Sequence, residues 1–270
     1  MKKFSALLLT LVMVLSLAAC GSKTEPAADT KEPAAEAGFT TVEAEKLHMS
    51  TSADFPPYEM IADDGSFEGI DVEVAQAIAD KLGLELVVDD MDFDAALLAA
   101  QNGQSDIVMA GVTVNEERLA VMDFSDSYAT GVQVVIVKED SPIATVDDLA
   151  NAEMIGCQAA TTGYIYCSDS VENGGYGEDH VTAYDSGATA VMALVNGQVD
   201  AVVIDNEPAK AFVAANPGLK ILDTEFAVED YAIGMKKGNT ELLNAINAAM
   251  AELKADGTFQ AIVDKYITAE

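Results

Sequence analysis

Arg118 is the residue whose type points most directly to chemistry, because it is the single arginine in a chain with 13 lysines. A lysine ammonium acts as a point charge, whereas a guanidinium holds a carboxylate through two parallel hydrogen bonds. Arg118 also lies just beyond an apolar run that ends at Val114. It therefore indicates recognition of a carboxylate. The alternative is a surface arginine paired with Glu117 or Asp123.

Hydroxyl and small residues close to this arginine are suited to the same task. Thr113 lies five residues before it and follows Ala110 and Gly111, whose backbone amides can face an anion. Thr161 and Thr162 begin a predicted helix, and a helix N-terminus offers amides and hydroxyls to an anion. Simple capping of that helix is an equally good interpretation.

Asp205 directly follows the apolar residues 201–204 and can accept hydrogen bonds from an ammonium group. Its alternative role is to cap the helix around Pro208. Aromatic residues in predicted loops or at a helix start can enclose a ligand side chain, although single aromatics more often belong to the core. They are Phe55, Tyr58 and Phe93.

Alternating strands and helices must position these residues. The periodicity predicts strands at 84–88, 107–114, 132–137, 154–157, 201–204, 220–222 and 231–235, and helices at 71–82, 93–102, 186–196, 240–254 and 258–267. Such alternation predicts an α/β fold with parallel sheets covered by helices, whose ligands bind beyond the carboxyl ends of the strands. The corresponding loops are 51–58, 110–118, 158–162 and 205–207. The pattern restarts after 132–137, which favours two lobes over one long sheet.

The first residues have the features of an export signal. Lys2 and Lys3 precede an apolar run at 7–17, which is short for a hydrocarbon core of roughly 30 Å. Leu-Ala-Ala-Cys, ending at Cys20, looks like the lipobox of bacterial lipoproteins, so we predict a signal peptide at 1–19 and a lipid on Cys20. An ordinary signal peptide with an incidental cysteine is the alternative. Residues 20–45, rich in Ala, Glu, Thr, Pro and Lys, are predicted to be a flexible tether.

The charge excludes some partners. With 46 acidic and 14 basic side chains, the protein repels phosphate backbones and anionic membrane surfaces, which excludes nucleic acid and leaves the lipid as the membrane anchor. His48 and His180 are isolated, so no metal site is expected. Cys157 and Cys167 are predicted to form a disulfide in an exported protein, with two buried free thiols as the alternative.

Catalytic and cofactor motifs are not apparent. The sequence contains no Gly-x-Ser-x-Gly elbow, no phosphate-binding glycine loop and no His-Glu-x-x-His pair. We therefore expect neither catalysis nor a cofactor.

Several motifs in order resemble the polar amino-acid binding proteins of ABC transporters, solute-binding proteins of family 3 with the type II periplasmic-binding fold. The resemblance covers about 46–267. It rests on Asp54-Phe55-Pro56-Pro57-Tyr58-Glu59, Gly69-Ile70-Asp71-Val72-Glu73, Asp92-Phe93-Asp94, Ala110-Gly111-Val112-Thr113-Val114-Asn115-Glu116-Glu117-Arg118, Asp123-Phe124-Ser125-Asp126-Ser127-Tyr128, Asp200-Ala201-Val202-Val203-Ile204-Asp205 and Asp256-Gly257-Thr258.

The resemblance implies two lobes, 46–136 plus 233–270 and 137–232, joined by two crossing strands and closing on a ligand. Arg118, helped by Thr113 and by amides near Gly111 and Thr162, would bind an amino acid's α-carboxylate. Asp205 would bind its ammonium. Phe55 and Phe93 would line the side-chain pocket, while Ser52 and Gln158 would select the side chain.

Two departures from the family pattern bear on the ligand. Ser52 stands where many relatives have Asp, which favours a neutral polar amino acid, and Ala160 replaces the usual Gly before the double threonine. The implied function is the monomeric extracytoplasmic receptor of an ABC importer, anchored outside the cell membrane and serving a permease. The alternatives are a dehydratase-like enzyme with Glu207 or Glu59 as general acid, and a sensor for a signalling partner.

Overall fold

The computed structural model describes residues 38–267. The predicted signal peptide, the lipid site at Cys20 and residues 20–37 of the predicted tether lie outside this range. Residues 38–45 contact the first lobe, where Phe39 packs against the core and the Val42 N–H donates to Asp106 Oδ1 at 2.7 Å. No helix within 38–267 combines the length and apolar character needed to cross a membrane.

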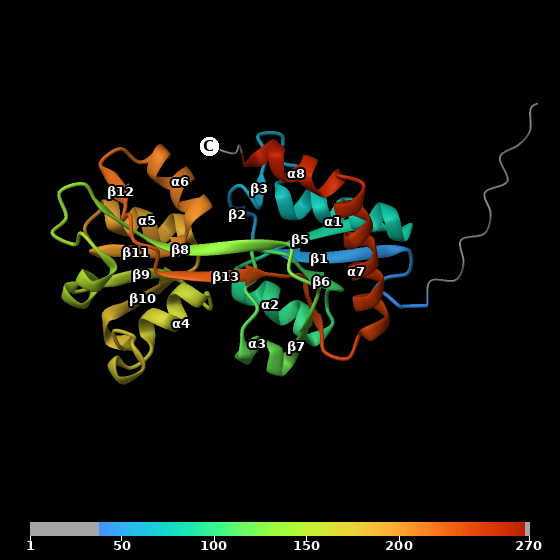
Figure 1. Cartoon of the computed structure of the whole chain (residues 1–270), viewed down its shortest axis with the longest axis horizontal. Helices are drawn as coiled ribbons and strands as arrows, with labels where there is room; N and C mark the ends of the chain where they lie inside the picture. Colours follow the sequence, from blue (N-terminus) through green and yellow to red (C-terminus); the bar gives the residue numbers. More distant parts are fainter. Residues whose placement is uncertain (1–37, 268–270) are drawn as a thin grey trace, which may run out of the picture. The chain divides into compact units, whose positions relative to one another are not determined.

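The first lobe is built on a five-stranded sheet in the order β5-β1-β6-β14-β7 (Figure 1). Its strands are β1 (Lys46–Thr51), β5 (Glu85–Asp90), β6 (Ile107–Val108), β7 (Met122–Phe124) and β14 (Gly234–Lys236). A small antiparallel sheet contains β2 (Asp54–Phe55), β3 (Glu59–Ile61) and β4 (Phe67–Glu68). The helices are α1 (Ile70–Leu82), α2 (Phe93–Asn102), α3 (Glu116–Val121), α7 (Thr240–Ala255) and α8 (Thr258–Tyr266).

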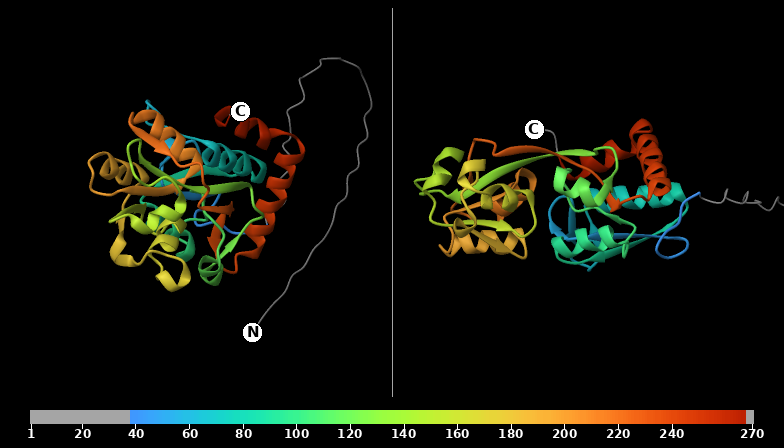
Figure 2. Two further views of the ribbon diagram at one scale, coloured as in Figure 1. Left: turned by 60° about the vertical axis from the view of Figure 1, so that its left-hand side comes forward. Right: turned by 90° about the horizontal axis from the view of Figure 1, so that it is seen from below.

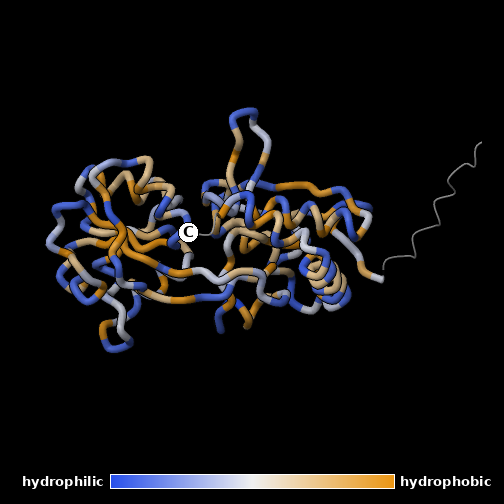
Figure 3. The backbone as a smooth tube through the Cα atoms, turned by 45° about the horizontal axis from the view of Figure 1, so that its top comes forward, coloured by the Kyte–Doolittle hydropathy of each residue, from blue (hydrophilic) through white to orange (hydrophobic). Residues whose placement is uncertain are grey.

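The second lobe is built on a six-stranded sheet in the order β10-β9-β11-β8-β12, with β13 also paired to β8. Its strands are β8 (Ala129–Lys138), β9 (Ile155–Gln158), β10 (Val181–Tyr184), β11 (Ala201–Asp205), β12 (Leu219–Ile221) and β13 (Ala227–Tyr231). Its helices are α4 (Thr162–Ser168), α5 (Gly187–Val195) and α6 (Asn206–Ala215), with 3-10 turns at Val146–Asn151, Val171–Asn173 and Glu178–His180. Hydrophobic residues concentrate along its central strands (Figure 3).

Strands β8 and β13 form an antiparallel ribbon that joins the lobes, as predicted for two crossing strands (Figures 1 and 2). Its register pairs Ala129 with Tyr231 and Gln133 with Ala227. The lobe boundary predicted after residue 136 falls inside β8, because residues 133–136 already pair with β11 of the second sheet. We call this pair of strands the ribbon.

Local patterns identified most helices. In α1, a buried face of Val74, Ala75, Ile78 and Ala79 confirms the predicted periodicity, and Gly83 ends the helix at φ 71°. The predicted helices at 93–102, 186–196, 240–254 and 258–267 correspond closely to α2, α5, α7 and α8.

Two strand predictions were wrong in extent, and the sheets are mixed rather than parallel. Only residues 107–108 of the predicted strand 107–114 belong to the sheet, because the chain then turns at Gly111 (φ 55°), whose N–H donates to Asp71 Oδ2. The predicted strand 231–235 is divided between β13, in the ribbon, and β14, which runs antiparallel to β6 and β7. An apolar run alone does not reveal such a break.

Cys157 and Cys167 do not form the predicted disulfide in this structure. Cys157 and Cys167 are free thiols, fully buried in the apolar core of the second lobe. Hydrogen bonding to Cys167 together with burial raises the pKa of Cys157 well above its usual range. A buried free cysteine packs as a small hydrophobic residue, which accounts for this pair without a covalent bond.

We expect Cys157 and Cys167 to resist alkylation in the native protein and to react separately once it is unfolded without reductant. Burial blocks reagent access to both thiols, and the raised pKa of Cys157 also disfavours its reactive thiolate. Peptide mapping by mass spectrometry checks this, and a linked pair of peptides from the unreduced protein would restore the disulfide prediction.

Candidate functional site

One cavity brings together eleven of the twelve predicted site residues. Residues of both lobes surround it. Those from the first lobe are Ser52, Phe55, Phe93, Ala110, Gly111, Thr113 and Arg118, and those from the second are Gln158, Thr161, Thr162 and Asp205. Asp54 and Glu59 also line it, although the prediction of ligand contacts did not include them.

Arg118 is buried, with 8% of its surface exposed, and is held from both lobes. Asn115 caps α3 by accepting the Arg118 N–H at 2.8 Å, which places the side chain at the start of the helix. The guanidinium donates from Nη1 to the Thr113 carbonyl at 2.7 Å and from Nη2 to the Ala160 carbonyl at 3.1 Å. Its carbon lies 5.5 Å from the centre of the Phe93 ring. These contacts use part of the five-donor fork.

The charge on Arg118 is offset inside the site. Burial lowers the pKa of Arg118, while the Glu229 carboxylate raises it. Because a guanidinium is effectively always protonated in proteins, Arg118 remains a buried cation. Neither Glu117 nor Asp123, the surface partners considered from the sequence, forms an ion pair with it among residues 38–267.

Ala160 stands where the family pattern has glycine, and its backbone conformation shows the effect of that replacement. It adopts φ 60°, in the left-handed region that glycine enters without steric cost. This conformation allows its carbonyl to accept from Arg118. The contact between the lobes is therefore kept, with backbone strain at Ala160.

Asp205 lies at the carboxyl end of β11, as predicted, and is oriented by the ribbon. Its carboxylate accepts from Gln133 Nε2 at 2.7 Å and from the Tyr231 hydroxyl. Burial raises the pKa of Asp205 to about 7, the Tyr231 hydrogen bond opposes this, and the Glu229 charge adds to it. The alternative capping role is not observed, since its side chain makes no capping hydrogen bond to α6.

Glu229 is a site residue that sequence reasoning missed. It lies on β13, is only 7% exposed, and accepts from Thr113 Oγ1 at 3.0 Å and Thr162 Oγ1 at 2.8 Å. Gln133 Nε2 donates to it at 3.2 Å. Glu229 thus joins a hydroxyl of each lobe to the ribbon. The alternation in β13, where Glu229 and Tyr231 are buried and Asp230 is exposed, was the available signal.

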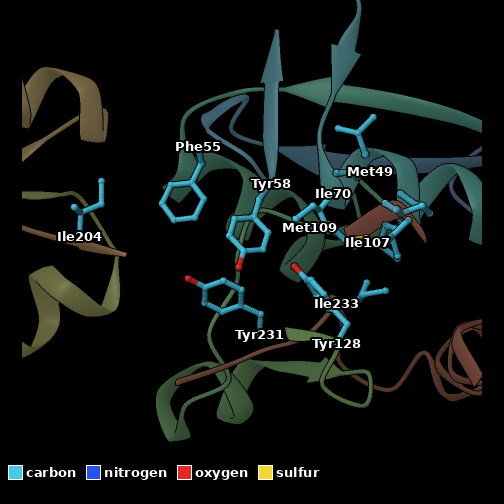
Figure 4. Close-up of a cluster of buried hydrophobic side chains, with 14 of the residues drawn as sticks. Met49, Phe55, Tyr58, Ile70, Ile107, Met109, Tyr128, Ile204, Tyr231 and Ile233 are labelled. Atoms are coloured by element: carbon cyan, nitrogen blue, oxygen red, sulfur yellow. The ribbon is translucent and has the colours of Figure 1, made fainter. Parts of the chain in front are cut away.

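Tyr58 is the predicted site residue that does not line the main cavity. Its ring packs between Phe55, at 5.9 Å between centroids, and Tyr231, at 5.4 Å (Figure 4). It borders a second cavity that Glu207 also lines. Tyr58 therefore supports Phe55 and the ribbon, and Glu207, considered as a general acid, lies away from the main cavity.

Ser52, Asp54, Glu59 and Gln158 also line the cavity, and we call this group of residues its polar end. Ser52 Oγ donates to Asp54 Oδ1 at 3.1 Å, and Gln158 Nε2 donates to the Asp185 carbonyl at 3.2 Å. Glu59 is fully buried, and burial and the Asp71 charge raise its pKa well above the usual range. Among residues 38–267, no group of three or more His, Cys, Asp or Glu side chains is arranged to hold a metal ion.

Comparisons with known proteins agree with this architecture. The arginine-binding extracellular protein ArtP of Bacillus subtilis is 31% identical over the full length of both chains. The L-cystine-binding protein TcyJ of Escherichia coli is 31% identical over 83% of each chain. The crystal structure of the arginine-, lysine-, histidine-binding protein ArtJ of Geobacillus stearothermophilus superposes with a TM-score of 0.77 at 30% identity, covering 83% of this chain and 96% of ArtJ.

These similar proteins are solute-binding proteins rather than enzymes, and those named for ABC transporters confirm the class expected from the motifs. The two-lobed α/β fold is the type II periplasmic-binding fold of these neighbours. The family model described as bacterial extracellular solute-binding proteins, family 3, matches residues 47–269. The chain therefore belongs to this family and is an amino-acid-binding component of an ABC transporter.

Proposed function

We propose that the cavity binds one α-amino acid, with its carboxylate on Arg118 and its ammonium on Asp205. The observation that carries this assignment is that a buried arginine of one lobe and a buried aspartate of the other face a single cavity. Thr113, Thr162 and Gly111 line the same cavity, but their hydroxyl and amide protons are donated to Glu229 and Asp71. The guanidinium of Arg118, whose donor fork is only partly used, is therefore the group that would bind the carboxylate.

The placement of the two charges couples binding to closure of the lobes. A zwitterion that leaves water needs a hydrogen-bonded counter-charge at each end. Because Arg118 and Asp205 belong to different lobes, only the closed arrangement satisfies both ends. The ligand then stabilises the closed form through contacts that the open form lacks. A permease can distinguish the loaded receptor from the empty one by this difference.

The proposal extends to location and partners. The family is extracellular by description, and the Leu-Ala-Ala-Cys sequence supports a lipid at Cys20 that holds a monomeric receptor at the outer face of the cell membrane. There it delivers its ligand to the permease subunits of an ABC importer. The preference for a neutral polar amino acid expected from Ser52 stays a prediction, since the relatives are named for cystine and for arginine.

We expect Arg118→Ala to weaken amino-acid binding by about 3–5 kcal/mol, because the ligand carboxylate would be buried without its partner. Arg118→Lys keeps the charge but loses the fork, so it should recover only part of the affinity. Titration calorimetry with the 20 standard amino acids measures this, with Lys210→Ala as a control that removes an exposed cation from α6. Unchanged affinity in Arg118→Ala would refute the carboxylate assignment.

We expect affinity to rise with pH up to about 7. Burial raises the pKa of Asp205 to about 7 in the free protein, and a bound ammonium favours the ionised carboxylate. Below pH 7 binding must release a proton, so the dissociation constant should increase by up to about tenfold per pH unit. Calorimetry at pH 5 to 8, in buffers of different ionisation enthalpy, measures both effects.

The matched variant is Asp205→Asn, which should bind more weakly and lose this proton release. Proton release that is unchanged in Asp205→Asn, or absent from the unmodified protein at pH 6, would contradict the assignment of the ammonium to Asp205.

A further inference from the structure

The polar end of the cavity presents hydrogen-bond acceptors. Ser52 donates its hydroxyl proton to Asp54, so its oxygen lone pairs are left for a ligand. Gln158 commits its amide nitrogen to the Asp185 carbonyl, which leaves its amide oxygen as the other polar atom. Asp54 adds a carboxylate. A ligand group that enters this end therefore meets three acceptors.

The charges in the cavity are also unbalanced. The ligand carboxylate and ammonium offset Arg118 and Asp205, and Glu229 accepts from two threonines and Gln133. Asp54 accepts from Ser52 and is partly buried, and burial, with a contribution from the Asp90 charge, raises its pKa. Asp54 is thus a carboxylate at the cavity wall that a neutral ligand would leave without a counter-charge.

A second carboxyl group lies at this end. Glu59 is fully buried and lines the cavity, and within 38–267 no donor reaches its oxygens, while burial and the neighbouring Asp71 carboxyl raise its pKa well above the usual range. Phe55 on β2 is the register partner of Glu59 on β3, and its side chain borders the same cavity. An aromatic face of this kind attracts a flat cation.

We propose that the bound amino acid has a cationic side chain, held by Asp54 with the oxygens of Ser52 and Gln158. This inference rests on the proposed function and names the side-chain class for the same site. A neutral amide side chain such as that of glutamine brings an acceptor oxygen as well as donors, and that oxygen would face acceptors. A guanidinium or ammonium group brings donors only. This proposal replaces the neutral polar preference expected from Ser52. Asp54 supplies the carboxylate that is missing at position 52, where many relatives have Asp.

Arginine and citrulline provide the direct test, because citrulline has nearly the same shape with a neutral urea in place of the guanidinium. Calorimetry on the unmodified protein should give arginine an affinity about 10- to 100-fold higher than that of citrulline, the range expected for hydrogen bonds to a charged group. Lysine and ornithine, measured in parallel, show whether an ammonium is accepted as well.

The Asp54→Asn variant should lower the affinity for arginine about 10- to 100-fold and leave that for citrulline within a few-fold. Asp63→Asn is the matched control, since it removes the same charge from an exposed position between β3 and β4. Circular dichroism and thermal unfolding show whether each variant is folded.

The outcomes separate the two proposals. Equal binding of arginine and citrulline, or a preference for glutamine, would overturn the cationic assignment while leaving an amino-acid receptor. An equal loss for both ligands in Asp54→Asn would overturn the role of Asp54. Failure of every amino acid to bind would refute the proposed function itself.

Discussion

The buried guanidinium of Arg118 is the constraint on which the site depends. A cation removed from water costs several kcal/mol unless neighbouring groups replace its hydration. The guanidinium donates hydrogen bonds to the carbonyls of Thr113 and Ala160, one from each lobe. The negative charge of Glu229 further stabilises its charged form. The left-handed backbone at Ala160 is understandable in these terms, because it turns a carbonyl of the second lobe toward the cation.

The ribbon connects this cation to the rest of the site. Gln133 on β8 donates to both Asp205 and Glu229, while Tyr231 on β13 donates to Asp205. The strands that join the lobes therefore also orient the carboxylates around the cavity. The Thr113 hydroxyl of the first lobe donates to Glu229 on the ribbon, so movement of the first lobe relative to the ribbon acts on this bond and gives ligand binding a physical route to the hinge. Close packing reinforces the link, since a Cβ at Gly131 would lie 2.4 Å from the Tyr231 ring.

Two sets of residues lining the cavity divide recognition into separate tasks. Arg118 and Asp205 offer a donor fork and a carboxylate, whereas the residues of the polar end, Ser52, Asp54 and Gln158, offer acceptors. The first set suits any α-amino acid, which is consistent with a fold shared by proteins named for arginine and for cystine. Selection of the side chain then depends on a few polar atoms at the polar end, which explains how one architecture can serve different ligands.

The sequence by itself determined the features that depend on neighbours along the chain. The single arginine, the periodicity of α1 and the aspartate at the end of β11 were all readable from the sequence, because composition and the buried face of an element depend only on nearby residues. Motif order was enough for the two-lobed fold and for eleven residues that line one cavity.

Only the tertiary structure decided the roles of Glu229, Asp54 and Tyr58, the free state of the cysteines, and the division of 231–235 between two strands. Thr113 and Glu229 are 116 residues apart, and Gln133 and Asp205 are 72 apart. Such contacts depend on the register of the ribbon and on how the lobes meet. Local periodicity carries no information about either, because it reports which face of an element is buried and not which distant residue covers it.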